Sequence, residues 1–206
     1  MARRPTISTA EILTSAREVF FERGADAPTA EIARRAGVSE GSIFRRFPTK
    51  QALFLAAMGI DKAPPWLEHL DRLGGDDLRE ELAELALQII EGTREMLPRM
   101  MMTWSTQSPP RMPGEAHAVP VRIISAVSDF LDRQMRAGRL RVAHPEIVAR
   151  AFVGTLVHFV FFETMGIEMA GAIDARTFAR SLVDTLWQGI QPQVAGRGAR
   201  DPEKSE

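Results

Sequence analysis

The chain has 206 residues, no cysteine and a formal net charge of −1, from 26 Lys and Arg against 27 Asp and Glu. The absence of cysteine excludes disulfides and thiolate metal sites and is typical of the reducing cytoplasm, where we expect this protein. Charge is unevenly distributed, because residues 1–62 hold 10 basic and 7 acidic side chains, a net of +3, whereas residues 63–206 hold 16 and 20, a net of −4. A basic excess at one end is typical of a segment that binds nucleic acid.

The first predicted helix begins after Ser8, which forms the S-x-x-E pattern of a capping box with Glu11. Gly24 ends this helix. Apolar residues at helical spacing give it one buried stripe: Ile12, Ala16, Val19 and Phe20. Residues 1–7 are expected to be disordered, and their polar continuation does not resemble a secretory signal.

Residues 28–47, PTAEIARRAGVSEGSIFRRF, are typical of two short helices joined by a tight turn. Thr29 is expected to cap the first of these helices with its hydroxyl, and Ser39 is expected to cap the second. Gly37 supplies the positive φ that a sharp turn after a helix needs. The pattern predicts a helix-turn-helix, although short helix pairs with a glycine turn also occur as plain structural corners.

The second helix of this motif turns a small and then basic surface outward. Gly41 and Ser42 allow it to enter a major groove about 12 Å wide, where arginines can reach phosphates or base edges. For Arg34 and Arg35 on the first helix, DNA contact and a solvated charged face both stay open. The predicted DNA contacts are Thr29, Ser39, Glu40, Gly41, Ser42, Phe44, Arg45, Arg46 and Lys50.

The N-terminal part of the chain, about residues 1–55, resembles the DNA-binding domain of the tetracycline-repressor (TetR) family in EILTSAREVFFERG and PTAEIARRAGVSEGSIFRRFPTKQALF. The resemblance implies an all-helical homodimer whose larger C-terminal domain binds a small molecule and releases DNA in response. The family usually has a tyrosine at the position of Phe44, whose hydroxyl commonly meets a phosphate; here only the ring remains. Lys50 is implied as a phosphate anchor, and its place in the first turn of a helix capped by Thr49 indicates the same.

A fourth helix after Thr49 carries motion between the two domains in that family. Here Gly59 weakens it, and Pro64-Pro65 stops or kinks it. A long helix is predicted after Asp76 or Asp77, with its buried side extending from Leu78 to Met96. The segments predicted after it are a loop at 107–114 and helices at 120–137, 144–166 and 174–190.

A ligand pocket is predicted around three consecutive methionines, residues 100–102. Methionine adapts its shape, so this segment either lines a pocket for apolar ligands or fills a gap in the core. His158 and Glu163 lie in an apolar helix, where they either hydrogen-bond to each other or a neighbour, or contact a ligand. The expected ligand is hydrophobic or aromatic with one polar handle. The predicted pocket residues are Met100, Met101, Trp104, Phe130, His158, Phe159, Phe162 and Glu163.

The last two predicted helices are apolar over more than one stripe. One side is expected to meet the protein's own core and the other the same helices of a second copy, in an isologous four-helix interface. They resemble the pair through which TetR-family members dimerise. The apolar run 151–162 is short of the ~20 residues that span a bilayer, so no membrane partner is expected. The predicted interface residues are Phe152, Leu156, Phe178, Leu182, Leu186 and Trp187.

The sequence therefore predicts an all-α protein with an N-terminal three-helix helix-turn-helix domain (1–62), a C-terminal helical bundle with ligand pocket and dimer interface (63–190) and a disordered polar tail (191–206). Its four histidines lack metal-ligand spacing and no nucleophile motif is present, so we expect no enzyme, metal or cofactor. The expected function is a ligand-responsive, DNA-binding transcriptional regulator, a repressor released from a palindromic double-stranded DNA operator by a small hydrophobic effector. The alternative is a helical protein-interaction adapter, which leaves the outward-facing basic residues unexplained.

Overall fold

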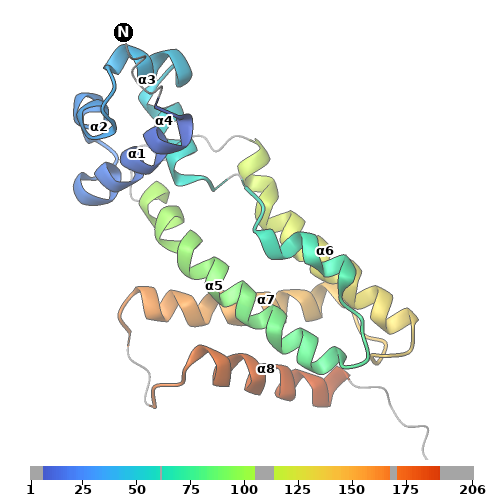
Figure 1. The fold of residues 1–206 in the computed structure, drawn as a ribbon. Coiled ribbons are helices and arrows are strands. Elements are labelled where there is room, and N and C mark those ends of the chain that lie inside the picture. The colour runs from blue at the N-terminus through green and yellow to red at the C-terminus, as the bar shows by residue number, and fades with distance from the viewer. Residues whose placement is uncertain (1–6, 61, 105–113, 168–170, 191–206) are drawn as a thin grey trace, which may run out of the picture. The chain divides into compact units, whose positions relative to one another are not determined.

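The computed structural model describes residues 7–60, 62–104, 114–167 and 171–190, and this part of the chain is helical without strands, which confirms the predicted all-α fold (Figure 1). The expectations for the N-terminal arm, the loop at 107–114 and the tail at 191–206 fall largely outside these residues. The elements are α1 (Thr9–Arg23), α2 (Thr29–Ala36), α3 (Glu40–Arg46), α4 (Lys50–Met58), the 3₁₀ helix η1 (Pro65–Arg72), α5 (Leu78–Trp104), α6 (Gly114–Arg136), α7 (Pro145–Thr164) and α8 (Ala175–Ile190).

Spatial proximity groups the chain into two compact units. The first unit joins the N-terminal segment, which ends at Pro64, to two later pieces of chain, Glu91–Arg122 and Val160–Ile167. The second unit consists of the remaining segments, Pro65–Ile90, Ile123–Phe159 and Glu168–Glu206. The C-terminal half of α5 therefore belongs to the same unit as the predicted helix-turn-helix.

The first helix begins as the sequence predicts. The Ser8 hydroxyl accepts a hydrogen bond from the Glu11 backbone N–H, and the Glu11 carboxylate accepts from the Ser8 N–H at 2.7 Å, which completes the capping box. The Ser8 hydroxyl also donates to the Glu11 carboxylate at 2.7 Å, and this hydrogen bond, followed by the one from the Ser8 N–H, holds the pKa of Glu11 below its usual value. The helix ends at Gly24, whose N–H donates to the Phe20 carbonyl.

The turn between α2 and α3 has the expected geometry. Gly37 ends α2 in the left-handed region with φ 68°, and the Ser39 hydroxyl caps α3 by accepting from the Ser42 N–H at 3.2 Å. The prediction that Thr29 caps α2 is wrong. Pro28 occupies the N-cap position and Thr29 is already helical and buried, so its hydroxyl is not placed to receive the helix's first free N–H groups.

Helix α4 is short. Thr49 caps it by accepting from the Ala52 N–H at 3.0 Å, and Gly59 ends it with φ 60°. The chain resumes helical structure only at Pro65, as the 3₁₀ helix η1. The break that Gly59 and the paired prolines predict is therefore present in the fold.

Two helices are longer than the proline positions indicate. Helix α5 continues through Pro98 to Trp104, and α6 begins at Gly114 rather than near Pro120, which lies inside it. A proline removes one backbone hydrogen-bond donor and is best tolerated in a first turn, which is why the sequence favours a helix start at Pro120. In the folded protein both helices pass through their prolines.

The interior of the second unit contains one face of α7, with Ala149 and Phe152 buried, against buried residues of α8 such as Val183. Phe159 of α7 stacks on Phe178 of α8, with ring centroids 4.2 Å apart. Arg79 of α5 pairs with Asp184 of α8 at 2.6 Å.

By length and composition alone, α7 is the one helix among the described residues that could cross a bilayer.

Candidate nucleic-acid interface

The helix-turn-helix is held by a core of large apolar side chains. Phe20 of α1 and Phe54 of α4 meet edge to face, with centroids 5.0 Å apart, and both are buried. Ile32 of α2 and Ile43 of α3 are fully buried in the same cluster. Because one residue of each of the four helices is fixed in this core, the outward face of α3 is set by its helical geometry.

The predicted DNA contacts differ in how accessible they are. Phe44 is 42% exposed, and Glu40, Gly41, Arg45 and Arg46 are also exposed on α3. The other predicted positions on this side are exposed at Ser39 and half-buried at Ser42 and Lys50, whereas Thr29 is buried. The structure thus brings the predicted contacts of α3 onto one exposed helix and removes the Thr29 side chain from that surface.

The fold does not require a glycine at position 41. Its φ is not positive, and a Cβ built on it would meet no atom closer than 3.9 Å, which is the Ser39 hydroxyl. Glycine in a helix costs about 1 kcal/mol relative to alanine. Packing within the protein therefore does not account for the missing side chain at this position.

The arginines of α2 are bound within the protein. Arg35 makes a bidentate ion pair with Glu22 of α1, with both N···O distances at 2.6 Å. These contacts hold the pKa of Glu22 below its usual value. Arg34 lies 3.6 Å from Glu31 on its own helix. Arg35 therefore ties α1 to α2, a role that is neither of the two alternatives left open for it.

The basic residues of α3 and α4 are used differently. Among the described residues, neither Arg45 nor Lys50 makes a side-chain hydrogen bond or ion pair. Arg46 donates to the Ile7 carbonyl at 2.9 Å, which fixes the chain before α1 beside the end of α3. Arg45 and Lys50 are therefore the cations of this surface that are available to an external anion.

Two family models match the chain. The model described as bacterial regulatory proteins, tetR family, matches residues 12–57, and the model described as AefR-like transcriptional repressor, C-terminal domain, matches residues 80–191. This chain belongs to the TetR family. The first match covers α1 to α4, and the second covers more than half of the chain. TetR-family proteins are DNA-binding transcriptional regulators, and the predicted resemblance is confirmed.

Solved structures share the fold at low sequence identity. A TetR-family regulator from Mesorhizobium loti MAFF303099 aligns with TM-score 0.72 and 19% identity, over 88% of this chain and 96% of its own. SmeT, the repressor of the Stenotrophomonas maltophilia multidrug efflux pump SmeDEF, aligns with TM-score 0.65 and 20% identity, over 97% and 98%. NalD, the secondary repressor of the MexAB-OprM pump of Pseudomonas aeruginosa, aligns with TM-score 0.60 and 22% identity, over 89% and 95%. Among curated proteins, no significant match is found.

The predicted ligand-pocket residues are divided between the two units of this TetR-family protein. Met100, Met101, Trp104, Phe162 and Glu163 belong to the first unit, and Phe130, His158 and Phe159 belong to the second. For the methionines and for Glu163, the structure has the packing or pairing that was the alternative to ligand contact. Met100 packs with Met96 and Met102 against the helix-turn-helix core, and Glu163 pairs with Arg94 of α5 at 2.7 Å.

The predicted interface residues on α7 face inward. Phe152 and Leu156 are buried in their own protomer, 4% and 0% exposed, so they cannot form its outer surface. On α8, Leu186 and Trp187 share the lining of a small, partly open pocket with Phe152, and Phe178 and Leu182 are half-buried.

Sequence reasoning missed the exposed face of α7 in the second unit. This face carries Ile147, which is 63% exposed, and Val157, which is 36% exposed. Ala151 and Gly154 lie between them and are also exposed. The spacings of four, three and three residues place these positions on one side of a helix, and that spacing was the signal that could have identified them.

Proposed function

We propose that this TetR-family protein is a dimeric repressor, which binds a palindromic operator through α3 and is released by a small hydrophobic or aromatic effector. The observation that carries the DNA-binding part is α3 itself, an exposed short helix with a glycine that the fold does not need and an arginine without an internal partner. Both features suit a helix that lies in the major groove against a polyanion. The description of the C-terminal family model as a transcriptional repressor supports the direction of control.

Dimerisation through the exposed face of α7 is part of this proposal. The face combines apolar side chains at its ends with Ala151 and Gly154 between them, and no atom lies within 4 Å of a Cβ built on Gly154. Small residues let the backbone of a partner helix approach closely. A two-fold dimer places two α3 helices on successive major grooves, about 34–36 Å apart, which a palindromic site matches.

The effector signal is proposed to reach the DNA-binding helices through α5, because α4 ends at Gly59. Met96, Met100 and Met102 of α5 pack against the helix-turn-helix core. Arg17 of α1 donates to the Ala57 carbonyl of α4 at 2.9 Å, and this hydrogen bond ties α1 to α4. Burial first, and then the charge of Arg99 on α5, lowers the pKa of Arg17.

Arg45→Ala is expected to weaken operator binding by roughly 1–3 kcal/mol and to relax the preference at one operator position, because Arg45 is the exposed and unpaired arginine of α3. The measurement is fluorescence anisotropy with DNA from the region upstream of the protein's gene and with a set of single-base variants of that DNA. Arg23→Ala is the control, since Arg23 lies on α1 outside the predicted DNA contacts and pairs with Glu31 at 3.0 Å. Uniform weakening across the whole set would make Arg45 a backbone contact.

Lys50→Ala is expected to weaken specific and non-specific DNA alike. If Lys50 neutralises one phosphate in each half-site, the slope of log K against log salt becomes less steep by about 0.9 for each phosphate that the variant leaves unneutralised. The measurement is a salt titration from low to physiological ionic strength for both proteins. An unchanged slope, with weakening confined to one sequence, contradicts the role of Lys50 as an anchor.

Effector control is tested by linkage. SmeT has been solved in complex with triclosan, so chlorinated phenols are reasonable first probes for this chain. A ligand that releases DNA must bind more weakly to the operator complex by the same factor, and a coupling of about 1–3 kcal/mol corresponds to roughly 5- to 150-fold. Titrations with and without operator DNA measure that factor. A compound that binds the C-terminal domain equally well in both states is not an effector.

A further inference from the structure

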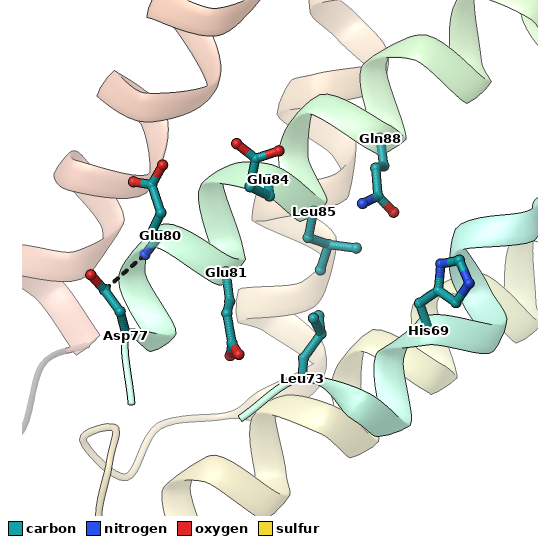
Figure 2. A pocket seen from close by; sticks show the side chains of 8 residues that line it. All are labelled: His69, Leu73, Asp77, Glu80, Glu81, Glu84, Leu85 and Gln88. Carbon is teal, nitrogen blue, oxygen red and sulfur yellow. Dashed lines mark hydrogen bonds between the residues drawn. The ribbon is translucent and has the colours of Figure 1, made fainter. Parts of the chain in front are cut away.

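A cavity of about 310 Å³ lies in the second unit between η1 and the first half of α5 (Figure 2). The carboxylates that line it are engaged within the protein. Asp77 accepts from the Glu80 N–H at 3.0 Å, and Glu81 accepts from the N–H groups of residues 74 and 75. Glu80 and Glu84 pair with arginines of α8 at 2.5 and 3.8 Å. These carboxylates therefore hold the loop at 74–75 and α8 to α5.

Phe44 of α3 is different, because the fold does not use the exposed part of its ring. The ring is 42% exposed, and within the described helices α1 to α4 the other large apolar side chain as exposed as this is Phe21 of α1. Among the described residues, Phe44 stacks on no other aromatic ring. Apolar surface gains free energy when it leaves water. The exposed part of the ring can therefore stabilise contact with an apolar group of another molecule.

The helix surface one turn before Phe44 is open. Residues three and four apart lie on one side of a helix, so Gly41 lies beside both Phe44 and Arg45. Apart from adjacent residues and the helix backbone, a Cβ built on Gly41 meets only the Ser39 hydroxyl within 4 Å, so the Phe44 ring does not fill this position. This turn of α3 therefore leaves room for a methyl-sized group next to the backbone.

We propose that the ring of Phe44 reads one thymine in each half-site of the operator, through contact with the methyl group of that base. This inference rests on the proposed DNA binding through α3 and adds a base preference to it. In the major groove, thymine presents a methyl group, whereas the other base edges present only hydrogen-bond donors and acceptors. A phenyl ring makes no ordinary hydrogen bond with those groups, so another base at this position loses water without gaining a partner. Without a hydroxyl, the ring also cannot donate to a phosphate.

The test replaces thymidine by deoxyuridine, which removes only the methyl group, in the DNA from the region upstream of the protein's gene. Symmetry-related thymines are replaced together, one pair at a time, and anisotropy at low ionic strength measures the affinity. Burial of one group of this size contributes about 0.8 kcal/mol, which corresponds to roughly 4-fold in each half-site. Replacement of one thymine pair is therefore expected to weaken binding roughly 15-fold, and replacement of the other pairs is expected to change it little.

Phe44→Ala is expected to bind the thymine and deoxyuridine forms of that site equally well. Its matched control is Phe21→Ala, because Phe21 has the same exposed fraction and lies on α1 outside the predicted DNA contacts. The control is expected to keep the roughly 15-fold dependence on the methyl groups. Circular dichroism checks that both variants are folded.

Two results would overturn this inference while DNA binding through α3 stands. One is a bound site in which no thymine pair responds to loss of its methyl groups, and the other is a Phe44 variant that keeps the response. If the wild-type protein binds no DNA from the upstream region, the proposed function fails and this inference fails with it.

Discussion

Val157→Glu is expected to separate the dimer and to reduce operator affinity roughly 100- to 10,000-fold, the range over which two linked binding modules exceed one. Val157 is 36% exposed on the face of α7 that also carries Ile147, Ala151 and Gly154. In a monomer the glutamate is solvated at little cost. In a two-fold interface it is buried without a partner, close to the same charge from the other copy.

The control for this variant is Val142→Glu, since Val142 is 83% exposed and precedes α7 in the chain. Sedimentation equilibrium measures the oligomeric state of both variants, and anisotropy measures their affinity for the operator. The Val142 variant is expected to remain a dimer with normal DNA binding. If the Val157 variant behaves in the same way, the dimer interface lies elsewhere.

Phe20→Ala is expected to destabilise the helix-turn-helix by roughly 3–5 kcal/mol, because it removes a fully buried ring and leaves a cavity beside Phe54. A destabilisation of this size is a large share of the stability of a small domain, so DNA binding should fall with it. Phe21→Ala is the matched control. It changes the same residue type one position further along α1, where the ring is 42% exposed, and should change stability by only about 0.5 kcal/mol.

Hydrogen exchange of the amides of α1 to α4 is the suitable measurement for this pair. The three tryptophans are Trp66, Trp104 and Trp187, and the chain has no tyrosine, so none of these fluorophores lies within α1 to α4. Exchange resolves local opening of one part of a protein from global unfolding. Normal protection of these amides in the Phe20 variant would contradict the assignment of this ring as a core element.

The helix-turn-helix could be predicted from the sequence because its determinants are local. The capping box of Ser8 and Glu11, the left-handed Gly37 and the cap of Ser39 each act over three or four residues, and each has the expected geometry. The prediction that Thr29 caps α2 was wrong, although it too depends only on neighbouring residues. Threonine next to a proline fits both the N-cap and the first helical position, and the chain placed Pro28 at the cap.

Long-range partners decided the roles of the charged residues. Arg35 and Arg45 are both helical arginines within one motif, and their sequence surroundings do not separate them. Glu22 lies 13 residues before Arg35 and binds it because α1 packs against α2, whereas α3 places Arg45 in solvent. A carboxylate so distant in sequence becomes a neighbour only after folding.

The sequence by itself determined that the chain is all-helical, where the DNA-reading helix begins and ends, and which helices are apolar on two sides. It did not determine which of those sides faces inward. Phe152 and Ala151 are adjacent on α7, and periodicity places them on different faces without ranking the two. Only tertiary packing against α8 buried Phe152 and left the smaller Ala151 and Gly154 outside, because the larger side chain gains more from removal from water.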